Sequence, residues 1–133
     1  MVLDTSAIVA ILFNEPDAER YEQAIAQART RTVSAASLLE CSIVVEARYG
    51  EQGGHQLDRL VQQAAVSVAD VTTEHIEVAR AAFRRFGKGR HPAGLNFGDC
   101  FAYALAVVRS EPLLFKGADF ARTDVRPALL HVD

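Results

Sequence analysis

Short apolar runs alternate with longer amphipathic segments along the chain. The short runs are rich in Val and Leu and are bounded by polar residues, Gly or Pro, which predicts buried strands. Four strands are expected in the main sheet: residues 1–4, residues 31–34, residues 65–71 and the part of EPLLFKG that follows Pro112. The closing segment ALLHVD, residues 128–133, predicts one more short strand.

The segments between the strands have helical periodicity. Helices are expected over residues 6–13, from Pro16 to about residue 28, and over 37–50, 55–65, 73–86 and 96–110, with residues 87–95 as a loop. Two of these helices, SLLECSIVVEARYG and NFGDCFAYALAVVRS, are apolar on nearly all sides and are therefore expected to be covered on more than one face. The alternation predicts an α/β fold, a three-layer α/β/α sandwich around a mainly parallel sheet.

Composition limits the possible classes of protein. A chain of 133 residues that is 50% hydrophobic predicts a single domain over residues 1–133. A net charge of -3 argues against coating nucleic acid through bulk positive charge. No apolar run approaches the roughly 18 residues of a membrane span, and no signal peptide is evident, so we expect a cytoplasmic protein without a membrane partner. Cys41 and Cys100 are expected to be buried rather than paired.

Four acidic residues fall where the fold predicts one edge of the sheet. Asp4 closes the first strand, and Glu40 lies in the first turn of the helix after the second strand. Asp99 opens the helix over residues 96–110, and Asp119 follows the LLFKG strand. The carboxyl ends of parallel strands and the N-termini of the helices that follow share one edge, so these acids are expected to converge.

Each acid also has a purely structural interpretation. The segment from Ser37 to Glu40 fits a capping box, and Asp99 lies three residues after a possible N-cap. Asp4 is placed to cap the first helix, and Asp119 to form a turn. These interpretations stay open for each acid taken singly.

The joint placement favours a divalent cation. Carboxylates gathered without matching Lys or Arg raise one another's pKa unless a cation neutralises them. Oxygen ligands without a convergent set of His or Cys indicate Mg²⁺ or Mn²⁺ rather than zinc. Such ions support phosphoryl chemistry, so the pattern predicts a metal-dependent phosphodiesterase or phosphatase.

Four stretches of the chain, taken in order, resemble the PIN-domain ribonucleases, and most closely the VapC-type toxins of toxin–antitoxin pairs. They are VLDTSAIVAILFNEP, SAASLLECSIVV, FGKGRHPAGLNFGDCFAYALA and LLFKGADFARTDV. The resemblance implies an α/β/α sandwich and a Mg²⁺- or Mn²⁺-dependent endoribonuclease that cuts RNA. It also implies inhibition by a small VapB-type antitoxin, and we expect a homodimer.

The resemblance also implies roles for the acids. Asp4, Glu40 and Asp99 match the three acids of the family's site, and Asp119 is the best match for the fourth. Many relatives carry a Thr and an acid nearer the strand end, where this chain has Phe-Lys-Gly, so Asp124 is an alternative for the fourth position. We expect Asp4 and Asp99 to hold the metal directly. Glu40 and Asp119 are expected to orient or deprotonate the attacking water, or to support a second ion.

Four further residues are candidate substrate contacts: Thr5, Ser6, Lys88 and Arg90. The hydroxyls of Thr5 and Ser6 are placed either to bind a phosphate or metal-bound water, or to cap the next helix. Lys88 and Arg90 belong to the basic stretch RRFGKGRH, residues 84–91. This stretch either guides an RNA backbone toward the acids or complements a helix C-terminus.

Three other classes are weighed against this one. A haloacid-dehalogenase phosphatase needs a second acid two residues after the first, but position 6 is Ser. A phospho-receiver domain matches Asp70 and Lys116 but lacks the paired acids near the first strand. A PIN domain that has lost catalysis and only binds RNA or a partner is disfavoured because all four acidic positions are retained.

Overall fold

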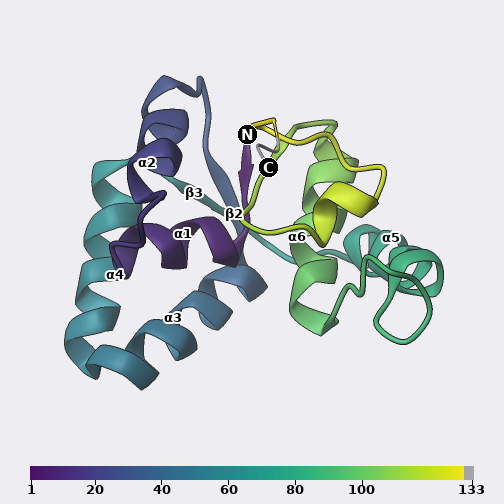
Figure 1. The fold of residues 1–133 in the computed structure, drawn as a ribbon, viewed down its shortest axis with the longest axis horizontal. Helices are drawn as coiled ribbons and strands as arrows, with labels where there is room; N and C mark the ends of the chain where they lie inside the picture. The colour runs from purple at the N-terminus through teal and green to yellow at the C-terminus, as the bar shows by residue number, and fades with distance from the viewer. Residues whose placement is uncertain (131–133) are drawn as a thin grey trace.

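A parallel sheet lies between two layers of helices in the computed structural model, which describes residues 1–130 (Figure 1). The strands run in the order β3-β2-β1-β4, and every neighbouring pair is parallel. They are β1 (Val2–Leu3), β2 (Thr32–Ser34), β3 (Ser67–Ala69) and β4 (Leu113–Leu114). The predicted α/β sandwich with a mainly parallel sheet is confirmed.

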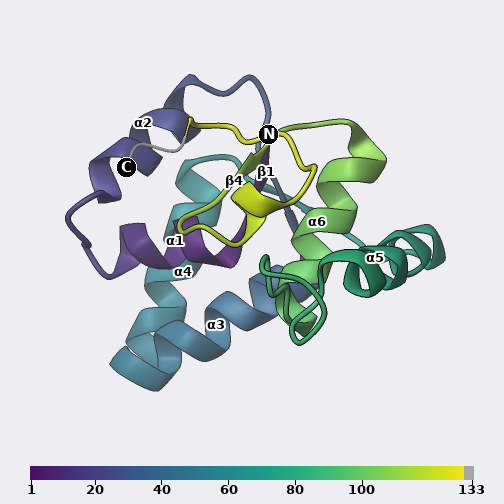
Figure 2. The ribbon, with the colours of Figure 1, turned by 45° about the vertical axis from the view of Figure 1, so that its right-hand side comes forward.

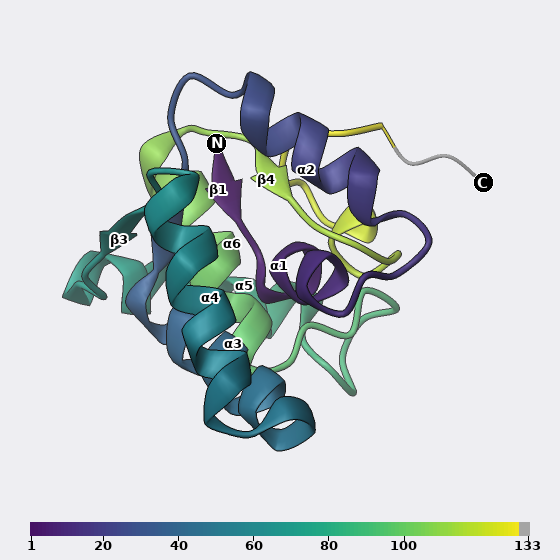
Figure 3. The same cartoon turned by 90° about the vertical axis from the view of Figure 1, so that its left-hand side faces the viewer.

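The helices cover both faces of this sheet. On one side lie α1 (Thr5–Leu12), α2 (Ala18–Gln27), α3 (Ala35–Tyr49) and α4 (Glu51–Gln63), which face the viewer in Figure 3. On the other side lie α5 (Thr73–Phe86), α6 (Phe97–Arg109) and the 3₁₀ helix η1 (Phe120–Arg122). The helix predicted over residues 73–86 therefore has its predicted bounds.

Burial on both faces stabilises strands that are only two or three residues long. Val2 and Leu113 pack with α5 and α6, whereas Leu3 and Leu114 pack with α1 to α4. Successive side chains of a strand point to opposite faces, and all four of these side chains are fully buried. Each contributes roughly 1.5–3 kcal/mol of hydrophobic stabilisation. Figure 2 shows β1 and β4 side by side at the centre of the molecule.

The helix that carries Glu40 begins earlier than predicted. α3 starts at Ala35, and its N-cap is Ser34, whose hydroxyl accepts a hydrogen bond from Ala36 N at 3.3 Å. The predicted capping box from Ser37 is therefore wrong, and Glu40 lies in the second turn rather than the first. The Ser37 hydroxyl is instead buried without a hydrogen-bond partner among residues 1–130.

α4 also begins before its predicted start, at Glu51, although Gly53 and Gly54 lie within it. Gly inside a helix is unfavourable by about 1 kcal/mol relative to Ala, which is why the sequence pattern placed the start later. Gly53 allows α4 to approach α3 closely, since a Cβ there would lie 2.5 Å from Val45 O. Tertiary packing therefore outweighs local propensity here.

The closing segment does not form the predicted strand over residues 128–130, and residues 131–133 of that prediction lie outside the described part of the chain. Only one isolated bridge joins Pro127 to Leu113, flanked by hydrogen bonds from Leu113 N to Arg126 O and from Ala128 N to Leu113 O. Cys41 and Cys100 are buried and unpaired, as expected. Among residues 1–130, no helix has the length and apolar character needed to cross a membrane.

Candidate active site

Asp4 lies at the carboxyl end of β1 and caps α1. Its Oδ2 accepts hydrogen bonds from Ser6 N at 3.0 Å and from Ser6 Oγ at 2.6 Å, and the residue is only 3% exposed. Ser6 Oγ also accepts a hydrogen bond from Lys116 N at 2.9 Å. The Ser6 hydroxyl therefore ties Asp4 to the segment after β4, and Asp4 rather than Thr5 or Ser6 is the helix cap.

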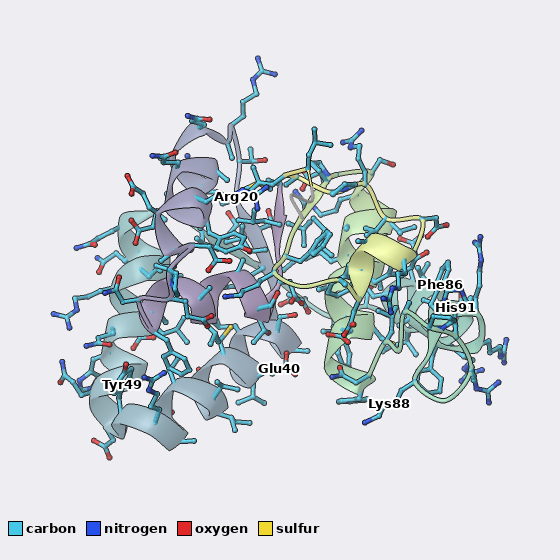
Figure 4. The ribbon with its side chains drawn as sticks, in the orientation of Figure 1. Arg20, Glu40, Tyr49, Phe86, Lys88 and His91 are labelled. Carbon is cyan, nitrogen blue, oxygen red and sulfur yellow. The ribbon has the colours of Figure 1, made fainter. Side chains whose placement is uncertain are left out.

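Glu40 projects from α3 toward Thr5. Thr5 Oγ1 donates a hydrogen bond to Glu40 Oε1 at 2.6 Å and approaches Ser37 O at 3.3 Å. Figure 4 places Glu40 on the lower side of that view, between the two helical layers. The Thr5 hydroxyl thus fixes the orientation of a second acidic side chain.

Asp99 takes part in a capping box at the start of α6. Asp99 N donates to Asn96 Oδ1 at 2.9 Å, and Asn96 N donates to Asp99 Oδ2 at 3.0 Å. The structural interpretation of Asp99 is therefore correct. It is compatible with a second role, since within residues 1–130 no hydrogen bond reaches Asp99 Oδ1.

The carboxylates influence one another electrostatically. Burial raises the pKa of Asp4 from 3.8 to about 6, against the lowering effect of the Ser6 hydrogen bonds, and the charges of Asp99 and Glu40 raise it further. Burial likewise raises the pKa of Asp99, and the charges of Asp119 and Glu40 add to this effect. The structure thus brings all four acids to one region, where each additional negative charge is costly.

Positive charge does not compensate these acids within the described residues. The ion pairs found there involve Glu15, Asp17, Glu111 and Asp124, and none of the four acids of this region. Over residues 1–130, no three His, Cys, Asp or Glu side chains lie close enough to hold a metal as they stand. The carboxylates are therefore near enough to repel one another but not drawn together as ligands. In chemical type, this set of hard oxygen donors fits Mg²⁺ or Mn²⁺.

The two candidates for the fourth acid have different surroundings. Asp119 is exposed and precedes η1, and its charge raises the pKa of Asp99. Asp124 instead accepts a hydrogen bond from Tyr103 Oη and forms an ion pair with Arg85 at 3.2 Å. The surroundings of Asp119 therefore favour it for the fourth position.

Lys116 makes contacts that the sequence did not reveal. Its ammonium pairs with Glu15 and with Asp17, the latter at 3.0 Å. This ion triad joins the α1–α2 loop to the segment after β4. The phospho-receiver interpretation used Lys116 as a pocket lysine, whereas its side chain is engaged by these two acids.

Lys88 and Arg90 are exposed on the loop between α5 and α6, and Figure 4 labels Lys88 on the same lower side of the view as Glu40. Arg90 lies 5.7 Å from the centre of the Phe83 ring. His91 is only partly exposed. Its Nδ1 accepts a hydrogen bond from Ala93 N at 3.0 Å, and its ring packs on Phe86. Lys88 and Arg90 are therefore the accessible cations of this loop.

Comparison with known families settles the class of the chain. The family described as the PIN domain matches residues 1–126. The chain belongs to the PIN-domain family. It is 57% identical over 125 residues to Ribonuclease VapC of Mycolicibacterium smegmatis, covering 94% of this chain and 97% of that protein. It is 53% identical over 130 residues to Ribonuclease VapC30 of Mycobacterium tuberculosis, covering 98% and 99%. The chain is therefore a PIN-domain VapC ribonuclease, and the resemblance seen in the sequence is confirmed.

Solved structures of VapC proteins share this PIN fold. VapC20 of Mycobacterium tuberculosis, described as a sarcin-ricin-loop-cleaving toxin, has a TM-score of 0.75 at 18% identity and covers 95% of this chain and 98% of its own. VapBC2 of Rickettsia felis, bound to a DNA fragment from its promoter, has a TM-score of 0.72 at 18% identity, covering 95% and 94%. At these identities, the likeness supports the fold alone.

Proposed function

We propose that this VapC ribonuclease is a toxin that hydrolyses RNA phosphodiester bonds with a divalent cation, Mg²⁺ or Mn²⁺, at the site formed by Asp4, Glu40, Asp99 and Asp119. The observation that carries the proposal is a group of carboxylates without a compensating basic side chain in the described residues. Burial and the charges of Asp99 and Glu40 raise the pKa of Asp4, and burial and the charges of Asp119 and Glu40 raise the pKa of Asp99. A buried anion without such compensation is costly, and a bound cation removes that cost.

In this mechanism, Asp4 and Asp99 would hold the cation, which supplies a Lewis acid for attack on the phosphodiester. Ser6 holds Oδ2 of Asp4, which leaves Oδ1 as a ligand atom. Glu40 and Asp119 orient the attacking water or accept its proton. Because water attacks instead of the RNA 2′-hydroxyl, the products carry a 5′-phosphate and a 3′-hydroxyl.

The proposed partner is a VapB-type antitoxin that covers the acidic edge. The solved structures with this fold include a VapBC2 complex of Rickettsia felis and a toxin–antitoxin complex from Klebsiella pneumoniae. We further propose that the protein is a cytoplasmic homodimer. Size measurement of the purified toxin, alone and with an antitoxin peptide, tests both associations.

Incubation of the purified protein with structured RNAs tests the proposed activity. Cleavage is expected with Mg²⁺ or Mn²⁺ and is expected to stop when EDTA is added, with 5′-phosphate ends on the downstream fragments. Cleavage that continues in EDTA would overturn the metal-dependent mechanism. Binding of RNA in Mg²⁺ without any cleavage would support the alternative of a PIN domain that only binds RNA.

Replacing both Lys88 and Arg90 by Ala is expected to raise the KM for RNA about threefold to tenfold with little change in kcat, because these exposed cations contact phosphates and not the reacting group. The slope of log KM against log salt should also fall by about 1 to 2. Arg29→Ala is a suitable control, since Arg29 is exposed in the loop before β2, at the amino end of the strand. An equal effect of the Arg29 variant would indicate nonspecific attraction.

A further inference from the structure

Gly98 occupies a place in α6 that its backbone conformation does not require. It is the second residue of the helix, and its φ angle does not lie in the positive range that favours glycine. Gly is less favourable than Ala within a helix, so local structure would prefer a side chain at this position. The reason for a glycine here must therefore be sought in tertiary contacts.

The carboxylate of Glu40 lies directly against Gly98. A Cβ at Gly98 would lie 2.1 Å from Glu40 Oε2 and 2.7 Å from Glu40 Cδ, far inside van der Waals contact. On the other side of the same carboxylate, Thr5 Oγ1 donates a hydrogen bond to Oε1 at 2.6 Å. The Glu40 carboxylate is thus held between α1 and α6, and the space it occupies exists because residue 98 has no side chain.

We infer that Gly98 is a positioning residue for Glu40. Because Gly98 has no side chain, the Glu40 carboxylate has room to lie in the acidic site beside Asp99. This inference deepens the proposed function and rests on it. The atoms that an added methyl group would meet belong to the end of a flexible side chain and not to the backbone. Gly98→Ala should therefore fold normally but turn the Glu40 carboxylate away from Thr5, so that stability and activity change in different directions.

The test compares Gly98→Ala with Gly54→Ala. Gly54 also lies within a helix, and a Cβ there would lie 3.2 Å from the carboxylate of another glutamate, Glu46, outside the acidic site. For Gly98→Ala we expect kcat to fall about 10- to 100-fold with KM nearly unchanged, as for a misplaced catalytic group. Its melting temperature in EDTA should equal or exceed that of the wild type, while the rise produced by Mg²⁺ should be smaller. Gly54→Ala should retain wild-type kcat and the wild-type response to Mg²⁺.

A double-mutant cycle identifies the route of the effect. In a Glu40→Ala background, adding Gly98→Ala should change kcat by less than about twofold, because the two substitutions act through one carboxylate. Wild-type kcat in Gly98→Ala, or an undiminished loss in the Glu40→Ala background, would overturn the inference while leaving the proposed function intact. A wild-type protein that does not cleave RNA in Mg²⁺ would overturn both.

Discussion

Asp4→Asn and Asp99→Asn are each expected to reduce RNA cleavage at least about 10³-fold, because in the proposed mechanism each removes a charged ligand of the divalent cation. Asn has nearly the same shape as Asp, and both positions retain a side-chain oxygen for helix capping. The loss should therefore come from charge and not from misfolding. Initial rates at saturating RNA, together with circular dichroism of each variant, provide the measurement.

Asp70→Asn supplies the matched control for this result. Asp70 directly follows β3, just as Asp4 follows β1, but it is exposed and does not contribute to the raised pKa of Asp4 or Asp99. The variant is expected to cleave RNA at the wild-type rate. Full activity of Asp4→Asn, or equal losses in the Asp70 and Asp4 variants, would contradict the role of the acidic site. A loss of cleavage in Asp70→Asn alone would likewise contradict it, because the reaction would then depend on a carboxylate outside the acidic site.

The convergence of the four acids at one edge of the sheet could be predicted from one rule about parallel sheets. The positions of Asp4 and Asp99 could be predicted because carboxyl ends of strands and N-termini of following helices share an edge. In the structure Asp4 is the N-cap of α1, and Asp99 is the partner of the N-cap Asn96 in the capping box of α6. The place of Glu40 within its helix could be predicted less precisely. Ser34 and Ser37 are both plausible N-caps, and the choice between them depends on where β2 leaves the sheet, which local sequence does not determine.

Contacts between distant elements were not predictable from local patterns. The glycine at position 98 was visible in the sequence, but only the packing of α6 against α3 shows that it lies on the Glu40 carboxylate. The pairing of Lys116 with Glu15 and Asp17 likewise depends on the path of the α1–α2 loop. The signal that sequence reasoning had for Gly98 was its presence in a helix that would otherwise favour Ala.

The apolar pattern of the last residues was misleading for a different reason. ALLHVD is a short and mainly apolar run, which predicts a further strand. In the structure, pairing with Leu113 is limited to one bridge at Pro127, with the hydrogen bonds of Arg126 O and Ala128 N. Ala128 and Leu129 pack instead against the core that contains Leu3 and Leu114, so their apolar character reflects burial and not strand pairing.

In the absence of a divalent cation, the protein is expected to lose about 3 kcal/mol of stability as the pH rises from about 4 to above 6. The pKa of Asp4 is about 6 in the folded protein, against 3.8 for an unperturbed aspartate. Below pH 3.8 the carboxyl is protonated in both states, and above 6 it is charged in both. Between these values, the folded state binds more protons than the unfolded state, so stability falls with rising pH. The raised pKa of Asp99 acts in the same direction.

Urea unfolding in EDTA at several pH values between 4 and 8 measures this loss, with Asp4→Asn as the informative variant. The uncharged Asn cannot titrate, so the variant should show a flatter profile and exceed the wild type in stability above pH 6, although it cleaves RNA far more slowly. Asp70→Asn should follow the wild-type profile. Saturating Mg²⁺ should stabilise the wild type more at pH 8 than at pH 5, since the cation binds the charged carboxylate and competes with the proton. A wild-type profile as flat as that of Asp4→Asn would show that Asp4 is not a costly charge, and the physical argument for a cation at this site would fail with it.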